Sequence, residues 1–391
     1  MARDESGLSG IFTAAEKAAP TDSVRVVARN LTERFGAVDV SFLFLDLVGR
    51  EMVRLTSVGE VDAGSRPDRT PLRGSVYEEV LNSQQIHFEP VGEDGQRLVA
   101  PVTNRGDTIG VLELTLPRFE QYMVEGVRET LHALAYIVVT DRRFTDLYHW
   151  GQRTIPMSLA AEIQHQLLPS ASCCEAAQFT LAGALIPTED IAGDTYDYAL
   201  DRDILYVSIT DIMGHDVKSA LMANLLVGAL RGARRVGHGL EEQARQAHRA
   251  LVDHGDSNMA TGQLMSIGLK EESAEFVNAG HPWPLRLRDG AVEEVHLEVD
   301  LPFGIDSSEP HRVQKIALRP HDRLLLFTDG MQERRAEAVD LRFLLQETAH
   351  MHPREVVRIL TEEVILASRG EPADDATVLC MDWHGVGSDQ D

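Results

Sequence analysis

Five aspartates stand where apolar strands would end or glycine turns would begin. Asp194 lies in IAGDTYD, Asp211 ends ILYVSITD, Asp329 ends RLLLFTDG after its strand, and the pair Asp374 and Asp375 precedes TVLCMDW. An aspartate beside a glycine is usually a turn residue, so each one taken singly predicts only a turn. The pattern of all five together predicts a shared site.

Divalent metal binding is the chemistry that such a group of carboxylates supports. The strands ILYVSITD and RLLLFTDG are apolar enough to be central, and we expect them to lie side by side with their ends together. Carboxylates crowded there repel by about 1 kcal/mol per close pair in water, and several-fold more at an effective dielectric of about 20, unless cations separate them. Ligands that are all oxygen favour Mg²⁺ or Mn²⁺ over zinc, and two such ions about 3.5–4 Å apart support phosphoryl hydrolysis.

The elements that must position these aspartates form a predicted α+β domain that begins near residue 157. We expect strands over 179–187, 204–211, 263–270, 274–280, 323–330 and 377–383, and helices over 157–169, 217–235, 239–253 and 353–368. Strands in runs, with helices in blocks, predict helices packed on mostly antiparallel sheets.

A separate α/β domain is predicted before it, over residues 20–145. We expect helices over 21–35, 74–82 and from Phe119 to about Trp150, and strands over 38–47, 51–58, 97–104 and 108–116. The segment 119–168 is interpreted as a helical linker that overlaps the end of this domain and is interrupted at Pro156. We expect flexible ends at 1–19 and 386–391.

Composition and charge restrict the classes of function. The 391 residues indicate two domains, and 37 Lys and Arg against 62 Asp and Glu give a net charge of −25, which disfavours binding to nucleic acid or an anionic membrane. Cys173, Cys174 and Cys380 form neither a disulfide framework nor a zinc pattern. No signal peptide or long apolar run is evident, so we expect a cytoplasmic protein that does not cross a membrane.

Six ordered segments of the second domain resemble a known family. They are IPTEDIAGDTYD (186–197), SITDIMGHD (208–216), NAGHPWPL (278–285), LPFGI (301–305), LLLFTDGMQE (325–333) and DDATVL (374–379). In order and spacing they resemble the protein phosphatase 2C-type (PPM) serine/threonine phosphatases, and more narrowly the bacterial stage II sporulation protein E-like branch. AAEIQHQLLP (160–169) resembles the helix that leads into such domains. The resemblance covers roughly 157–385 and implies an αββα sandwich, with the phosphatase domain at 169–385.

The resemblance also implies which residues act. A centre of two Mn²⁺ or Mg²⁺ ions would be held by Asp194, Asp211, the backbone carbonyl of Ile212, Asp329 and Asp374, with Asp375 behind these ligands or as an alternative ligand. The aspartates would be catalytic through metal-bound water, which attacks phosphorus in line without a protein nucleophile. No organic cofactor is expected.

Two positions depart from the family pattern. Ala192-Gly193-Asp194 stands where the family usually has Gly-Gly-Asp, and Gly214-His215-Asp216 stands where it has Gly-His-Gly. The first change adds only a methyl group. In the second, Asp216 could take left-handed backbone geometry, as aspartate does more readily than most residues, and its charge could alter metal affinity.

Other polar residues near the motifs have two interpretations each. His215 and His281 could assist the leaving group or could be structural hydrogen-bonding residues. Arg234 with Arg235, and Arg334 with Arg335, could contact an acidic protein substrate or lie solvated at element ends.

The N-terminal domain, with its segment APVTNRGDTIGVLEL, resembles a GAF sensor domain, and a PAS-like domain is the alternative. The absence of cysteine before Cys173 argues against a bilin thioether, while His87 or His132 could hold haem or be structural. A small-molecule or protein ligand would change the 119–168 helices, which would reposition the metal loops. The apolar stripe of the long helix predicts a parallel homodimer, or else it completes the sensor core.

The function implied by the resemblance is the dephosphorylation of a phosphorylated anti-sigma factor antagonist, which would control sigma-factor-dependent transcription. A non-catalytic signalling scaffold built on the same fold is the alternative from another class. A haloacid dehalogenase-like phosphohydrolase is the alternative among enzymes, but TDGM at 328–331 lacks the upstream acid that a DxD motif needs.

Overall fold

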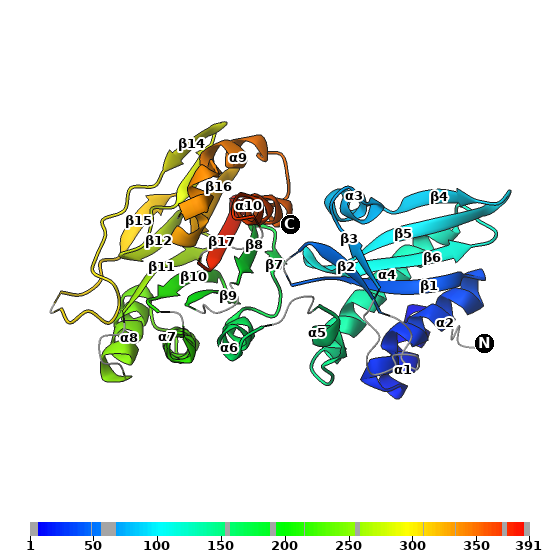
Figure 1. The fold of residues 1–391 in the computed structure, drawn as a ribbon, viewed down its shortest axis with the longest axis horizontal. Coiled ribbons are helices and arrows are strands. Elements are labelled where there is room, and N and C mark those ends of the chain that lie inside the picture. The colour runs from blue at the N-terminus through cyan, green and yellow to red at the C-terminus, as the bar shows by residue number, and fades with distance from the viewer. Residues whose placement is uncertain are drawn as a thin grey trace. The chain divides into compact units, whose positions relative to one another are not determined.

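The computed structural model describes residues 7–47, 49–55, 68–152, 157–187, 193–214, 216–254, 259–307, 309–332, 334–369 and 374–386 (Figure 1). The chain divides into two units, Met1–Ile155 and Pro156–Asp391. Each unit is described by itself.

The N-terminal unit is built on a six-stranded antiparallel sheet in the order β3-β2-β1-β6-β5-β4. Its elements in chain order are α1 (Leu8–Lys17), η1 (Pro20–Asp22), α2 (Ser23–Phe35), β1 (Val38–Leu45), β2 (Glu51–Leu55), β3 (Arg69–Pro71), α3 (Val76–Ser83), β4 (His87–Val91), β5 (Gly95–Asn104), β6 (Asp107–Leu116), α4 (Met123–Asp141) and α5 (Leu147–Gln152).

Both faces of this sheet are covered by helices. Because successive side chains of a strand point to opposite sides, a single strand contributes to the core on each face. Phe42 and Phe44 of β1 join the core under α1, α2 and α4, whereas Leu43 between them joins a second core under α3. The predicted strands and the helix near 74–82 are therefore present, with β3, β4 and α1 as elements that sequence reasoning missed.

The structure differs from two expectations about this unit. Residues 8–17, expected within a flexible N-terminus, form α1, whose Ile11 is buried in the core. The long helix divides into α4 and α5, and its apolar stripe, including Val127, Leu131 and Leu134, is buried in the unit's own core. That stripe consequently gives no support to a dimer, which stays a prediction.

The C-terminal unit holds the remaining elements. They are α6 (Leu159–Leu167), β7 (Cys173–Glu175), β8 (Phe179–Ile186), β9 (Asp194–Asp201), β10 (Ile204–Ile212), α7 (Val217–Arg235), α8 (Leu240–His254), β11 (Ala260–Gly268), β12 (Ser273–Ala279), β13 (Leu285–Arg288), β14 (Ala291–Glu294), β15 (Gln314–Ala317), β16 (Asp322–Phe327), η2 (Asp329–Met331), η3 (Arg334–Ala338), α9 (Leu341–Glu347), α10 (Pro353–Ala367) and β17 (Ala376–Trp383).

These elements form four layers. A five-stranded sheet, β15-β12-β11-β10-β9, faces a six-stranded sheet, β14-β13-β16-β17-β8-β7, and a core containing Phe179, Phe276 and Trp383 fills the space between them. Figure 1 shows α6, α7 and α8 along one side of this sandwich and α9 and α10 along the other. The expected mostly antiparallel αββα architecture is confirmed.

One expectation about these strands is wrong. The strands that end at Asp211 and precede Asp329, β10 and β16, do not lie side by side, because they belong to different sheets. Their neighbours are β9 with β11, and β13 with β17. Apolar composition identifies a buried strand, but a two-sheet sandwich has two sets of buried strands, so composition alone does not give the partner.

Candidate active site

The site begins with a pair of aspartates on adjacent strands. Asp194 is the first residue of β9, where a glycine turn was expected, and Asp211 is the penultimate residue of β10. The antiparallel register places the two residues directly opposite each other. Asp194 is buried and Asp211 is partly exposed, so one carboxylate lies inside the domain and its neighbour lies at the surface.

Two threonines of the other sheet bind Asp194. Thr328, which directly follows β16, and Thr377 of β17 each donate a side-chain hydroxyl to Oδ2 of Asp194 at 2.7 Å. Thr377 also donates its backbone N–H to Oγ1 of Thr328 at 2.9 Å. These bonds join the ends of the two sheets at Asp194.

Asp375 organises the segment next to this pair. Its Oδ2 accepts hydrogen bonds from Nε2 of Gln164 at 2.6 Å and from the backbone N–H of Gly193 at 3.3 Å. The same Gln164 nitrogen donates to the backbone carbonyl of Asp194 at 2.7 Å. Asp375 is buried, and these bonds tie it to the backbone of Gly193 and, through Gln164, to Asp194.

The electrostatics of the pair are unfavourable without a cation. Burial raises the pKa of Asp194 well above its usual range, and the neighbouring carboxylates of Asp211 and Asp375 raise it further. Hydrogen bonds from Thr328 and Thr377 oppose this shift because they stabilise the charged form. A cation beside Asp194 would remove the conflict.

The other two aspartates predicted as metal ligands are more exposed to solvent than Asp194. Asp329 is exposed at the start of η2, and Asp374 is partly exposed, with Oδ1 accepting the backbone N–H of Asp375 at 2.9 Å. Within the described residues, no three His, Cys, Asp or Glu side chains are grouped closely enough to hold a metal ion. The structure thus brings Asp211 and Asp375 within electrostatic range of Asp194, without a complete ligand shell among the described residues.

The residues present nevertheless fit a hard divalent cation. The donors are carboxylate oxygens without thiol or imidazole, which is the set that Mg²⁺ and Mn²⁺ prefer. The buried carboxylate with a raised pKa is an independent sign, since a buried acid surrounded by acids is stabilised by a positive charge.

Gly193 lies against the predicted carbonyl ligand. Its own carbonyl accepts the backbone N–H of Ile212 at 3.1 Å, and a Cβ at this position would lie 2.5 Å from the Ile212 carbonyl oxygen and 3.2 Å from Oδ1 of Asp211. Only glycine permits this approach, so packing requires Gly193, the residue of the Ala192-Gly193 pair that matches the family pattern. Ala192 lies outside the described residues.

Asp216 does not take left-handed geometry. Its φ of −122° and ψ of 178° are extended, and its Oδ1 caps α7 by accepting the backbone N–H of Ser219 at 2.9 Å. The positive φ of this turn, 114°, belongs to Gly214. The aspartate found in place of glycine therefore serves as the helix N-cap, a role in which aspartate is among the preferred residues. His215 lies outside the described residues.

His281 lies in the interior near the site. It is 3% exposed, and its Nδ1 is 2.9 Å from Oγ1 of Thr261, the residue opposite Asp211 on β11. Burial lowers the pKa of His281 to about 3, against a smaller opposing effect of the Phe327 backbone. The imidazole is therefore neutral, which favours the structural interpretation of this residue over a proton donor.

The arginines proposed to contact substrate have other partners where their side chains are described. Arg234 donates from Nη1 to Oδ2 of buried Asp197 at 3.1 Å, and Arg335 donates to the carbonyl of Ser368 at 3.4 Å. Arg235 is exposed at the end of α7, and the side chain of Arg334 lies outside the description.

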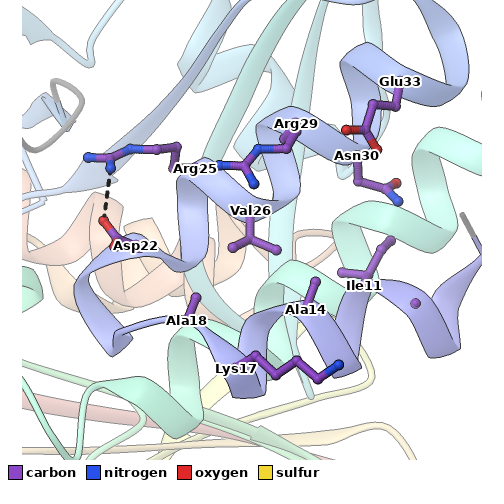
Figure 2. A pocket seen from close by; sticks show the side chains of 11 residues that line it. Ile11, Ala14, Lys17, Ala18, Asp22, Arg25, Val26, Arg29, Asn30 and Glu33 are labelled. Atoms are coloured by element: carbon purple, nitrogen blue, oxygen red, sulfur yellow. Dashed lines mark ion pairs between the residues drawn. The ribbon is translucent and has the colours of Figure 1, made fainter. Parts of the chain in front are cut away.

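The N-terminal unit carries a surface cavity of about 280 Å³ between α1 and α2 (Figure 2). Figure 2 shows Lys17, Arg29 and Glu33 among its lining residues, and Arg25 paired with Asp22 at 3.2 Å. A smaller cavity of about 170 Å³ includes His132, which is exposed. His87 on β4 is 3.6 Å from Glu79 and 3.7 Å from Glu89, so its nearest charged neighbours are carboxylates.

Sequence reasoning missed Gln164, Thr328 and Thr377 as site residues. The two threonines adjoin segments that were identified, but their hydroxyls reach Asp194 only through the packing of one sheet on the other. Gln164 could have been identified from the sequence, because it is a polar residue on the face of α6 that is buried together with Ala161 and Leu167. A buried polar residue needs a hydrogen-bond partner, and the partners of Gln164 are Asp194 and Asp375.

Residues 201–384 match the family described as Stage II sporulation protein E (SpoIIE). The phosphoserine phosphatase RsbU of Bacillus subtilis (strain 168) is 21% identical over 233 residues, which are 58% of this chain and 69% of RsbU. The phosphoserine phosphatase RsbP of the same strain is 25% identical over 186 residues, 46% of this chain and 44% of RsbP.

Several solved structures are also similar to part of this chain. The RsbU and RsbW domains of Rv1364c from Mycobacterium tuberculosis align with a TM-score of 0.48 and 26% identity over 54% of this chain and 61% of that one. RsbX in complex with magnesium (12% identity, 54% and 98% covered, TM-score 0.44) and PstP with two manganese ions (18%, 52% and 98%, 0.43) are also similar. The RsbX structure contains magnesium, and the PstP structure contains manganese.

The C-terminal unit is a four-layer sandwich with acidic residues at the ends of its strands. Within this unit, residues 201–384 are similar to the SpoIIE family, and the chain is similar in sequence to the phosphatases RsbU and RsbP. The type of the N-terminal α/β unit is not identified by these comparisons. Among the residues that the structure describes, no helix is both long and apolar enough to span a membrane.

Proposed function

We propose that this chain is a metal-dependent protein-serine/threonine phosphatase. The observation that carries the proposal is the placement of Asp194 opposite Asp211 at the joined ends of two sheets, in a domain that matches the SpoIIE family. RsbU and RsbP, to which the domain is related, are phosphoserine phosphatases.

In this proposal Asp194, Asp211, the Ile212 carbonyl, Asp329 and Asp374 hold two Mn²⁺ or Mg²⁺ ions, and Asp375 supports them. Such ions, when bound, activate water for attack on phosphorus and neutralise the phosphoryl oxygens. The chain's own residues supply position: Thr328 and Thr377 hold one oxygen of Asp194, and Gly193 brings its backbone against Ile212. No side chain need act as a nucleophile.

The substrate we propose is a phosphorylated anti-sigma factor antagonist, whose dephosphorylation would control sigma-factor-dependent transcription. The relation to RsbU and RsbP supports this choice. We expect faster phosphate release from such a phosphoprotein than from a short phosphoserine peptide at equal concentration, since a protein offers surface contacts beyond the phosphate. Equal rates would contradict this substrate class.

A non-catalytic scaffold is the competing proposal. It is favoured by the exposed position of Asp329 and because, among the described residues, no three acidic side chains are grouped closely enough to hold a metal ion. The two proposals differ in a single measurable property, which is turnover that requires a divalent cation.

The test is phosphate release by the full chain from p-nitrophenyl phosphate and a phosphoserine peptide, with Mn²⁺, Mg²⁺ or EDTA. We expect turnover with Mn²⁺ or Mg²⁺ and none with EDTA. Asp211→Asn should lower the rate by more than about 100-fold, because it removes a charged ligand.

The matched control is Asp203→Asn in the turn of the same β9–β10 hairpin. Asp203 is exposed and its carboxylate is 3.0 Å from Nζ of Lys270, away from the site. Its substitution should leave the rate within about two-fold, as surface ion pairs contribute little. A folded wild-type chain with no turnover in either metal would favour the scaffold.

We also propose that the N-terminal unit is a GAF-like sensor that regulates the phosphatase through the 119–168 segment, with a small molecule or protein as its ligand. The proposal includes a parallel homodimer formed through the same segment. Light scattering on residues 1–168 at high concentration tests it, and a monomer there would remove the dimeric form of the switch.

A further inference from the structure

Thr261 of β11 is the third residue of a row that begins with the two aspartates of the site. The antiparallel register places Asp194 opposite Asp211, and Asp211 opposite Thr261. Directly opposite residues of antiparallel strands point to the same face of the sheet, with Cβ atoms about 4.5–5.5 Å apart. Thr261 is partly exposed, as Asp211 is. The row therefore places a hydroxyl beside the accessible carboxylate of the pair.

A buried imidazole holds this hydroxyl. Nδ1 of His281 is 2.9 Å from Oγ1 of Thr261, and His281 is neutral because burial lowers its pKa to about 3. The backbone of Phe327 lies near the ring, but Nε2 has no hydrogen-bond partner among the described residues. A neutral imidazole carries a single N–H, which is costly to bury without an acceptor, so the proton belongs on Nδ1. His281 then donates to Thr261, and the hydroxyl proton of Thr261 is free for another acceptor.

The loop that carries His281 is fixed by two buried amide side chains. The backbone N–H of His281 donates to Oδ1 of Asn278 at 2.8 Å, and its carbonyl accepts from Nδ2 of Asn278 at 3.0 Å. Gln263, two residues after Thr261 on β11, donates from Nε2 to the carbonyl of Pro282 at 2.6 Å. Asn278 and Gln263 are both fully buried. The imidazole is thus held in place before any substrate binds.

Resting on the function proposed above, we propose that Thr261 contacts the phosphoryl group of the substrate and that His281 positions it for this contact. The hydroxyl of Thr261 donates to a phosphoryl oxygen in front of Asp211, while its oxygen accepts from His281. No proton is transferred in this step. Two carboxylates repel an anionic phosphoryl group unless cations and hydrogen-bond donors lie beside them, and Thr261 is the donor that this row supplies.

The test of the contact is Thr261→Val in the full chain, which keeps the shape of the side chain and removes the hydroxyl. With Mn²⁺ and a phosphoserine peptide we expect kcat/KM to fall by about 10–100-fold, the range for a hydrogen bond to a charged group. The inhibition constant of inorganic phosphate should rise. Mn²⁺ affinity, measured by titration calorimetry, should stay unchanged, because Thr261 is not among the proposed ligands. Thr261→Ser retains the hydroxyl and should keep most of the rate.

Thr361→Val is the matched control. Thr361 of α10 is also buried, and its hydroxyl donates to the carbonyl of Arg358 in its own helix at 2.9 Å. Its loss should leave kcat/KM and phosphate inhibition unchanged. Wild-type kcat/KM in Thr261→Val would overturn the inference. A fall in Mn²⁺ affinity in proportion to the rate would also overturn it, because the hydroxyl would then serve Asp211 rather than the substrate.

The role of His281 is tested by His281→Phe, which keeps a ring and removes both nitrogens. Since His281 acts through Thr261, the double variant with Thr261→Val should lose no more kcat/KM than Thr261→Val alone. Additive losses would overturn the positioning role and leave the proposed phosphatase intact. If urea unfolding shows that His281→Phe does not fold, His281→Asn replaces it. The amide of asparagine can donate in place of Nδ1, so this variant should keep most of the rate, and a loss as large as that of Thr261→Val would count against the role.

The wild-type chain separates this inference from the proposed function. Metal-dependent turnover that is insensitive to Thr261→Val would overturn the inference alone. A wild-type chain that releases no phosphate with Mn²⁺ would instead overturn the proposed function, and this inference with it.

Discussion

Asp194 shows how a single residue can be placed against its own electrostatic preference. The side chain is buried beside two other carboxylates, which raises its pKa, while two threonine hydroxyls favour its charged form. A carboxylate with a raised folded-state pKa binds more protons folded than unfolded, so its contribution to stability is lost as pH rises. The metal-free protein carries this cost at neutral pH, and a cation would offset it.

His281 gives a pH-dependent prediction of opposite sign. Because burial lowers its pKa to about 3, the unfolded chain binds more protons than the folded chain between that value and its ordinary pKa near 6.5. Stability from this residue is full above about 6.5 and falls as the pH is lowered, by up to about 1.4 kcal/mol per unit.

We therefore expect His281→Gln to flatten the loss of unfolding free energy between pH 7.5 and 5.5, measured with urea in EDTA. Glutamine can still hydrogen-bond Thr261 but does not titrate. The exposed His254→Gln on α8 serves as control and should leave the profile unchanged. A His281→Gln profile parallel to that of the wild type would show that the pKa of this imidazole is the same in the folded and the unfolded protein.

At the scale of elements, the site depends on how strand ends meet. The β9–β10 pair supplies Asp194 and Asp211 from one sheet, and β16 and β17 supply Thr328 and Thr377 from the other. Helix α6 contributes Gln164 from outside both sheets. Each element brings only one or two polar residues, so the site exists only when the layers are packed.

The start of α7 gives a prediction at this scale. Asp216 caps the helix through Ser219, and Ser, Thr, Asp or Asn caps are worth about 0.5–2 kcal/mol relative to alanine. Asp216→Ala should lower the unfolding free energy by about 1 kcal/mol, whereas Asp216→Asn should change it little, because asparagine caps equally well. Chemical unfolding of the two variants measures this difference.

The same two variants distinguish the capping role of Asp216 from an effect of its charge on metal affinity. If the charge of Asp216 alters metal affinity, Asp216→Asn should change the Mn²⁺ dependence of turnover without changing stability. Equal losses of stability in both variants would contradict the capping role.

At the scale of the whole molecule, the two units have separate cores. The clusters around Phe42 and around Leu43 draw only on the first unit, and those around Phe179, Leu226 and Leu325 draw only on the second. Units with complete cores of their own can fold alone.

We accordingly expect a fragment of residues 157–391 to unfold cooperatively and to keep metal-dependent turnover. If the N-terminal unit regulates the site, the rate of the fragment should differ from that of the full chain. Circular dichroism with urea and phosphate release measure the two properties. Identical rates would argue against regulation, and a fragment that does not fold would show that the second unit needs the first.

Much of the second unit could be predicted from sequence because its signals are local. The periods of apolar residues gave the helices 217–235 and 353–368 to within a residue, and the strands β10 and β17 likewise. Aspartates at strand ends and glycine turns marked the candidate ligands. The placement of Asp194 opposite Asp211 agrees with that reading, while the full ligand set stays a proposal.

Tertiary structure decided what no local pattern contains. Local periodicity does not tell which sheet a buried strand joins, so β10 and β16 were wrongly placed together. The stripe of α4 is equally apolar whether it meets a partner or its own sheet, and only packing showed that it is buried within its unit. Gln164 reaches Asp375 across 211 positions of the chain. The sequence determined which residues could do chemistry, and the long-range packing of the layers decided which of them meet.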